Sequence, residues 1–204
     1  MPVVRAPSAE LAMRATDALL AGGISVFEIT MTVPGAVEVI RLLTQRWHGH
    51  ALIGAGTVLT PEDALACIEA GAEFIVGPGL NLATIAAAHG RDVPIMPGAL
   101  TPTEVITAWQ AGADMVKIFP CGALGGAKYL RALRGPLPQV RMLPTGGVSA
   151  ATAADYIAAG ASALGVGSEL VDTTALAAGQ DYLLTERARE LVAVVKAARD
   201  KLIS

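Results

Sequence analysis

The chain alternates between amphipathic segments of about ten residues and short apolar runs rich in β-branched residues. In the clearest unit, the polar start Thr60-Pro61-Glu62-Asp63 leads to the apolar run Phe74-Ile75-Val76. The pattern returns over residues 101–117 and 149–166, and more loosely up to residue 27. This recurrence predicts a repeated helix-then-strand unit.

Each repeat is bounded by residues that favour helix ends. Thr60, Thr101 and Ser149 suit the N-cap position, and proline follows the first two at the first helical position. Glu104 can complete a capping box with Thr101, and Asp63 offers a shorter version of the same arrangement. A glycine after each helix suits the left-handed turn that ends it.

Further apolar runs between the repeats complete a set of eight predicted strands. They cover residues 2–5, 51–53, 93–96 and 139–143. Eight strands, each followed by a helix, predict an α/β fold of the (β/α)8 TIM-barrel type, a single domain over residues 1–204. An open doubly wound sheet is the alternative.

The ends of the chain complete this prediction. Residues 182–202 have the pattern of an amphipathic helix that covers the last strand. The chain begins almost directly on its first predicted strand, and the sequence leaves open whether a helix precedes it.

The amino-acid composition argues against several classes of function. The 204 residues are 53% hydrophobic and 16% charged, with a formal net charge of −3, which gives no general attraction to nucleic acid or anionic membranes. We expect no membrane span, no signal peptide and, from two unpaired cysteines, a cytoplasmic protein. The three histidines are expected near helix ends, far from the strand tips, and His48 and His50 have no acidic or cysteine partner nearby. Neither a metal nor another cofactor is expected.

One cation stands inside an apolar predicted strand. Lys117 has the neighbours Met115, Val116, Ile118 and Phe119, none of which can neutralise it. Lysine is rarely buried unless it is paired or used chemically, and the alternative is an edge-strand residue that reaches solvent. The chemical reading is a desolvated amine of lowered pKa that attacks a carbonyl.

The second strand supplies a partner for this lysine. Strand alternation places Glu28 and Thr30 on one face and Phe27 and Ile29 on the other. Aligning the repeats puts Glu28 at the same height as Lys117, and both are expected to point into the barrel. Titratable groups at the carboxyl end of barrel strands favour a catalytic site.

Glycine-rich loops follow the last two predicted strands, at residues 145–149 and 165–168. Glycines beside a helix start let backbone N–H groups converge on a phosphate. The run Gly54-Ala55-Gly56-Thr57 is predicted to be a third anion cradle, although it lacks a dinucleotide fingerprint. Arg5, at the end of the first strand, is a candidate carboxylate clamp.

The whole chain resembles the class I 2-keto-3-deoxy-6-phosphogluconate (KDPG) aldolases, in the group that includes 4-hydroxy-2-oxoglutarate and 6-phosphogalactonate aldolases. The resemblance rests on Phe27-Glu28-Ile29-Thr30, Gly54-Ala55-Gly56-Thr57, Val76-Gly77-Pro78-Gly79, Lys117-Ile118-Phe119-Pro120 and Pro144-Thr145-Gly146-Gly147.

The resemblance implies a role for each matching residue. Lys117 matches the Schiff-base lysine and Glu28 the general acid/base. The other matches are substrate-binding: Thr57 and Thr145 for the pyruvyl carboxylate and substrate oxygens, Pro78 and Phe119 for the pocket walls, and Gly146, Gly147, Gly167 and Ser168 for the phosphate. It further implies a metal-independent, cytoplasmic homotrimer that cleaves a phosphorylated 2-keto acid to pyruvate and glyceraldehyde 3-phosphate.

One position departs from the gluconate-type pattern. Those members usually carry an arginine where this chain has Thr32, whereas Arg5 resembles an arginine of the galactonate-type members. The gluconate substrate is therefore a default, with the galactonate and hydroxy-oxoglutarate substrates as alternatives. An isomerase or epimerase acting on phosphosugars and a non-catalytic barrel that binds phosphate ligands are more distant alternatives.

Overall fold

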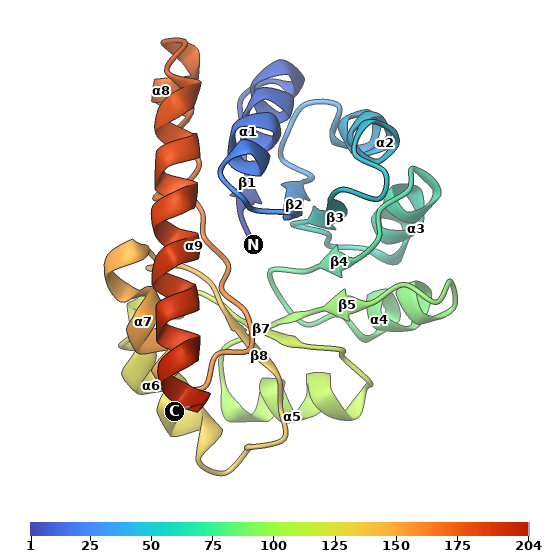
Figure 1. The fold of residues 1–204 in the computed structure, drawn as a ribbon. Coiled ribbons are helices and arrows are strands. Elements are labelled where there is room, and N and C mark those ends of the chain that lie inside the picture. The colour runs from blue at the N-terminus through green and yellow to red at the C-terminus, as the bar shows by residue number, and fades with distance from the viewer. Residues whose placement is uncertain (204) are drawn as a thin grey trace.

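The fold is built from short parallel strands that are each followed by a helix (Figure 1). The computed structural model describes residues 1–203, and the side chains of residues 1–202. The strands are β1 (Val3–Val4), β2 (Val26–Thr30), β3 (Leu52–Gly56), β4 (Ile75–Val76), β5 (Ile95–Met96), β6 (Gly98–Ala99), β7 (Val116–Ile118) and β8 (Met142–Pro144). Every pairing between them is parallel.

Helices surround these strands on the outside. They are α1 (Ala9–Ala21), α2 (Ala36–Arg46), α3 (Pro61–Glu69), α4 (Leu82–His89), α5 (Pro102–Gln110), the 3-10 helix η1 (Gly122–Leu124), α6 (Ala127–Arg134), α7 (Ala150–Ala158), α8 (Thr173–Ala177) and α9 (Asp181–Ile203). The long helix α9 packs along α1 and α7, as Figure 1 shows in red. No helix in residues 1–203 combines the length and the apolar character needed to cross a membrane.

The strands close into a barrel. β1 to β5 form one ladder and β6 to β8 another, and only Pro97 separates β5 from β6. On the other side, Gly165 bridges to Thr145 and Val166 bridges to Pro2, so residues 165–166 take the place of the eighth strand. The predicted (β/α)8 barrel is therefore confirmed, and the open sheet is wrong.

The strand bounds differ from the predicted ones at several places, most clearly in the third, seventh and eighth strands. β3 extends to Gly56, the predicted seventh strand is shifted to Met142–Pro144, and the eighth is reduced to two bridging residues. Strands buried on both faces show no alternation of polar and apolar residues, so the sequence pattern marks their existence better than their ends.

The predicted helix caps are present. The Thr60 hydroxyl accepts from the Asp63 N–H at 3.1 Å, and Thr101 and Glu104 form a complete capping box. Each cap satisfies backbone N–H groups at the start of a helix whose far end leads into the next strand. The repeated unit of the sequence is thus the repeated unit of the barrel.

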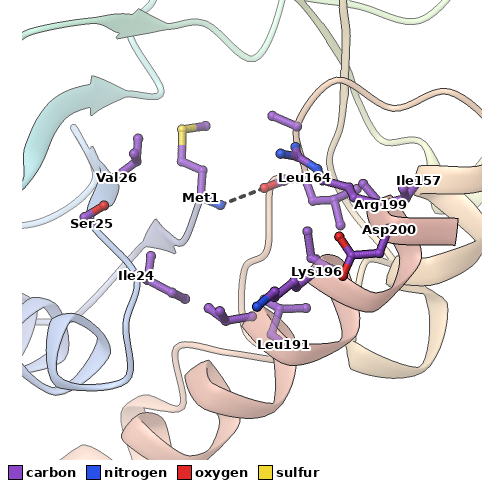
Figure 2. Close-up of a pocket in the computed structure, with 13 residues that line it drawn as sticks. Met1, Ile24, Ser25, Val26, Ile157, Leu164, Leu191, Lys196, Arg199 and Asp200 are labelled. Atoms are coloured by element: carbon purple, nitrogen blue, oxygen red, sulfur yellow. Dashed lines mark hydrogen bonds between the residues drawn. The ribbon is translucent and has the colours of Figure 1, made fainter. Parts of the chain in front are cut away.

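A mainly apolar cavity of about 550 Å³ lies at the amino ends of the strands (Figure 2). Ile24, Ser25 and Val26 line it from the start of β2, and Leu191 and Val195 line it from α9. The Met1 amine donates to the Leu164 carbonyl at 2.9 Å beside it. This cavity is at the end of the barrel opposite the residues predicted to be catalytic.

Candidate active site

Lys117 and Glu28 meet inside the barrel. Lys117 comes from β7 and is 4% exposed, and Glu28 comes from β2 and is fully buried. Lys117 Nζ donates to Glu28 Oε1 across 3.3 Å. The strand-parity prediction that both side chains point inward is confirmed, and the solvent-reaching reading of Lys117 is wrong because its ammonium is buried.

Burial controls the electrostatics of this pair. Loss of solvent raises the pKa of Glu28 above its usual range, and the positive charge of Lys117 opposes that rise only in part. Glu28 Oε2 has no hydrogen-bond partner within the described residues. An unpaired buried carboxylate oxygen is rare unless the group has a functional task. The Phe119 ring lies 5.5 Å from Lys117 Nζ and adds a weak cation–π contact.

The predicted anion cradle at residues 54–57 does not have the expected loop position. Gly54 and Gly56 lie inside β3, not in a loop after it. A Cβ on Gly54 would fall 2.3 Å from the Phe74 ring, and one on Gly56 would fall 2.1 Å from Glu28 Oε1. Neighbouring side chains therefore fill the space beside these two glycines.

A cavity of about 680 Å³ opens at the carboxyl ends of the strands. Its lining includes seven of the predicted site residues and the position that departs from the gluconate pattern: Arg5, Thr32, Phe119, Thr145, Gly146, Gly147, Gly167 and Ser168. The structure thus brings Arg5 and both predicted phosphate loops to one cavity.

The glycine loop after β8 has a backbone suited to anions. Gly146 has φ 86° and Gly147 has φ 76°, a left-handed conformation that favours glycine. The loop leads into α7, with Ser149 at its N-cap position. Successive backbone N–H groups beside a helix N-terminus are a general phosphate-binding arrangement.

Thr57 and Pro78 are not in the lining of this cavity. Thr57 follows β3 and has φ 57°, an unfavourable value for a β-branched residue. The Pro78 carbonyl group lies against Gly98, which pairs with Lys117 in the β6–β7 ladder. Thr57 therefore follows the strand that pairs with the strand of Glu28, and Pro78 touches the strand that pairs with the strand of Lys117.

The inward face of β2 contributes one residue that the sequence did not single out. The Thr30 hydroxyl lies 2.8 Å from the Thr32 hydroxyl and 3.2 Å from the Val4 carbonyl oxygen, which accepts from it. Thr30 shares its face with Glu28, so strand parity alone could have identified it. The Thr145 hydroxyl, buried and without a partner in the described residues, is a further polar group at this end.

The described residues contain no group of three or more metal-ligating side chains. His89 instead pairs with Asp114 at 3.3 Å, at the end of α4, where the sequence places it far from the strand tips.

Comparisons with known proteins agree with this geometry. The sequence model of the family described as KDPG and KHG aldolase matches residues 1–186. The KHG/KDPG aldolase of Escherichia coli is 40% identical over 94% of this chain and 90% of its own length. The 2-dehydro-3-deoxy-6-phosphogalactonate aldolase of the same species is 35% identical over 97% of this chain and 93% of its own length.

A solved structure shows the same architecture. The KDPG aldolase of Legionella pneumophila, with pyruvate captured as a covalent carbinolamine, superposes with a TM-score of 0.83 and is 31% identical, covering 93% of this chain and 95% of its own. A family match over most of the chain, relatives above 30% identity and a shared barrel lead to one conclusion: this chain belongs to the KDPG and KHG aldolase family.

Proposed function

We propose that Lys117 and Glu28 carry out the carbon–carbon cleavage for which this family is named. The chain is a class I aldolase, a lyase that works through a Schiff base. The buried pair itself supports these two roles, because an amine and a carboxylate lie 3.3 Å apart inside the barrel. The two groups supply a nucleophile and a proton carrier within reach of each other.

The reaction begins when the unprotonated Lys117 amine attacks the C2 ketone of the substrate. The resulting carbinolamine loses water to give an iminium, which accepts the electron pair of the C3–C4 bond as that bond breaks. Glu28 takes the proton from the C4 hydroxyl, and the aldehyde leaves. The enamine is then protonated at C3, and hydrolysis releases pyruvate and the free lysine.

The environment of Glu28 suits its role as the group that accepts and returns protons. Its raised pKa brings the carboxyl closer to the pH at which it must both accept and return protons. Its free Oε2 offers an acceptor for the C4 hydroxyl, directly or through water. Oε1 keeps its contact with Lys117, so both catalytic groups stay oriented.

The cavity of 680 Å³, together with Thr57 and Pro78 outside its lining, holds the rest of the substrate. Gly146, Gly147, Gly167 and Ser168 bind the phosphate, while Thr57 and Thr145 contact the oxygens of the pyruvyl part. Pro78 and Phe119 form walls, and Arg5 contributes the positive charge at this rim. Anchoring both ends of the substrate orients the scissile bond over Lys117.

The substrate is a 2-keto-3-deoxy-6-phospho sugar acid, with the gluconate form as the first choice. Thr32 stands in the cavity lining where gluconate-type members carry an arginine, and Arg5 lines the same cavity. This pair of residues makes the galactonate form the main alternative and 4-hydroxy-2-oxoglutarate the next.

A coupled assay of pyruvate release on these three substrates tests the proposal. We expect cleavage of at least one phosphorylated substrate by the wild type and a loss of at least 10³-fold in Lys117→Ala, because no imine can form. A matched control is Lys128→Ala, an exposed lysine on α6. Undiminished cleavage by Lys117→Ala would overturn the assignment.

The assembly and location follow from the same family resemblance. We expect a cytoplasmic homotrimer that needs no cofactor. The exposed side chains of Leu59 (57%) and Leu82 (53%) support association. Asn81 Nδ2 donates to the Leu59 carbonyl and so holds the segment of Leu59 beside the start of α4, where Leu82 lies.

A further inference from the structure

The Glu28 carboxylate reaches Lys117 by lying across the neighbouring strand. In the β2–β3 ladder Glu28 is opposite Gly54, and Thr30 is opposite Gly56. The Glu28 side chain nevertheless lies against Gly56, two residues further along β3. It therefore leans along the strand direction toward the carboxyl end of the barrel.

Gly56 has no backbone reason to be glycine. It lies in regular β structure and is absent from the glycines with positive φ. Its surroundings, by contrast, exclude a side chain: a Cβ would fall 2.1 Å from Glu28 Oε1, 2.3 Å from Cγ and 2.5 Å from Cδ. Real Cβ atoms do not approach other atoms so closely, and the fully buried Glu28 has no solvent into which it could move.

We propose that Gly56 is a positioning residue of the active site, whose missing side chain gives the Glu28 carboxylate the room it needs to meet Lys117. The inference rests on the proposed role of Glu28. Any side chain at position 56 displaces the carboxylate from the 3.3 Å contact and from the C4 hydroxyl of the substrate.

Two other proposed site residues are accommodated in the same way. A Cβ on Gly165 would fall 2.2 Å from Thr145 Oγ1, and a Cβ on Gly98 would fall 2.2 Å from the Pro78 carbonyl group. Gly98 and Gly165 also have no positive φ. Gly56, Gly98 and Gly165 thus each leave room for a polar group that comes from an adjacent segment, at the substrate end of the barrel.

The test is a double-mutant cycle that combines Gly56→Ala with Glu28→Ala. If Gly56 acts through Glu28, Gly56→Ala lowers kcat for cleavage at least 10²-fold in the wild-type background, the scale of lost general acid–base catalysis. In the Glu28→Ala background the same substitution changes the residual rate less than twofold, because the carboxylate is already gone. Equal losses in both backgrounds, or a Gly56→Ala enzyme with wild-type kcat, would overturn the proposal.

Gly54→Ala is the matched control. It lies on the same strand, also lacks a positive φ, and its added Cβ would meet the Phe74 ring instead of Glu28. Its effect on kcat should therefore be the same factor with or without Glu28.

Thermal unfolding covers the case in which Gly56→Ala folds poorly. Removing the Glu28 side chain frees the space, so Gly56→Ala/Glu28→Ala should melt about 2–4 °C above Gly56→Ala, the shift that about 1 kcal/mol produces in a chain of this length. Gly56→Ala/Glu28→Gln should show no such recovery, since glutamine occupies the same volume. Failure of the alanine double variant to recover would contradict the inference, whereas a wild type that cleaves no aldol substrate would contradict the proposed function.

Discussion

Glu28 is a charged residue removed from water. It is fully buried and forms an ion pair with Lys117 at 3.3 Å, while its second oxygen is unpaired within the described residues. A buried ion pair of this kind gives little or no net stability, because desolvating both charges costs about as much as their attraction returns. A catalytic role therefore explains this buried pair better than a contribution to the stability of the fold.

The pKa of Glu28 leads to a pH prediction. Burial favours the neutral carboxyl, so the pKa lies above the ordinary value of 4.5, and the proton-accepting carboxylate is lost as pH falls through that raised pKa. We therefore expect the acid limb of kcat/KM for cleavage to have its midpoint above pH 4.5. Circular dichroism over the same range separates this loss from unfolding. A midpoint at or below 4.5 in folded enzyme would show that Glu28 is not the group responsible.

Single residues also show how far the sequence could predict the site. Strand parity and the repeat were enough to place Glu28 and Lys117 together, because both follow from local periodicity. The sequence predicts a loop at Gly54 and Gly56, whereas the structure has them inside β3, facing Phe74 and Glu28, which are distant in the sequence. The side chains that fill the space beside a glycine come from neighbouring strands, so the local sequence pattern does not predict them.

At the scale of elements, the helices were more predictable than the strands. Cap residues define where α3 and α5 begin, and the structure has both caps at the expected positions. The strands β5 and β6 and the bridging residues 165–166 are only two residues long each. The bounds of these strands depend on how the barrel closes, and closure cannot be predicted from any short segment of the sequence.

The capping box of α5 predicts a measurable stability loss. The Thr101 hydroxyl accepts from the Glu104 N–H at 3.3 Å, and Glu104 Oε2 accepts from the Thr101 N–H at 2.8 Å. Thr101→Ala removes the first bond and should lower the free energy of unfolding by about 1 kcal/mol. Urea denaturation measures the change.

Thr103→Ala is the control for this variant. Its exposed side chain lies in the first turn of the same helix, and its carbonyl, which accepts from the Thr107 hydroxyl, is unaffected. We expect a change of less than about 0.5 kcal/mol. Equal losses for the two variants would mean that the cap does not contribute.

On the scale of the whole molecule, barrel closure joins the two parts of the site. Lys117 and the loop at residues 145–147 come from the β6–β8 ladder, whereas Glu28 and Thr57 come from the β1–β5 ladder. Only the continuity at Pro97 and the bridges of residues 165–166 bring these ladders into one ring. The internal repeat and the count of eight predicted strands made barrel closure predictable from the sequence, while the depth and lining of the cavity were not.

The expected homotrimer is tested in solution. Light scattering coupled to size-exclusion chromatography should give a mass three times the 20.8 kDa of one chain. Association would bury the exposed side chains of Leu59 and Leu82, whose segments are joined by the Asn81 hydrogen bond. A mass of one chain at micromolar concentration would contradict this expectation.

The central claim is that the Lys117 amine forms an imine with the keto acid. Incubation with pyruvate and borohydride, followed by peptide mass analysis, tests it most directly, because reduction fixes the imine as a stable secondary amine. We predict one adduct, located on the peptide that contains Lys117, and no adduct in Lys117→Ala. An unmodified Lys117 peptide, or an adduct on another lysine, would contradict the account and would favour an isomerase, an epimerase or a non-catalytic phosphate-binding barrel.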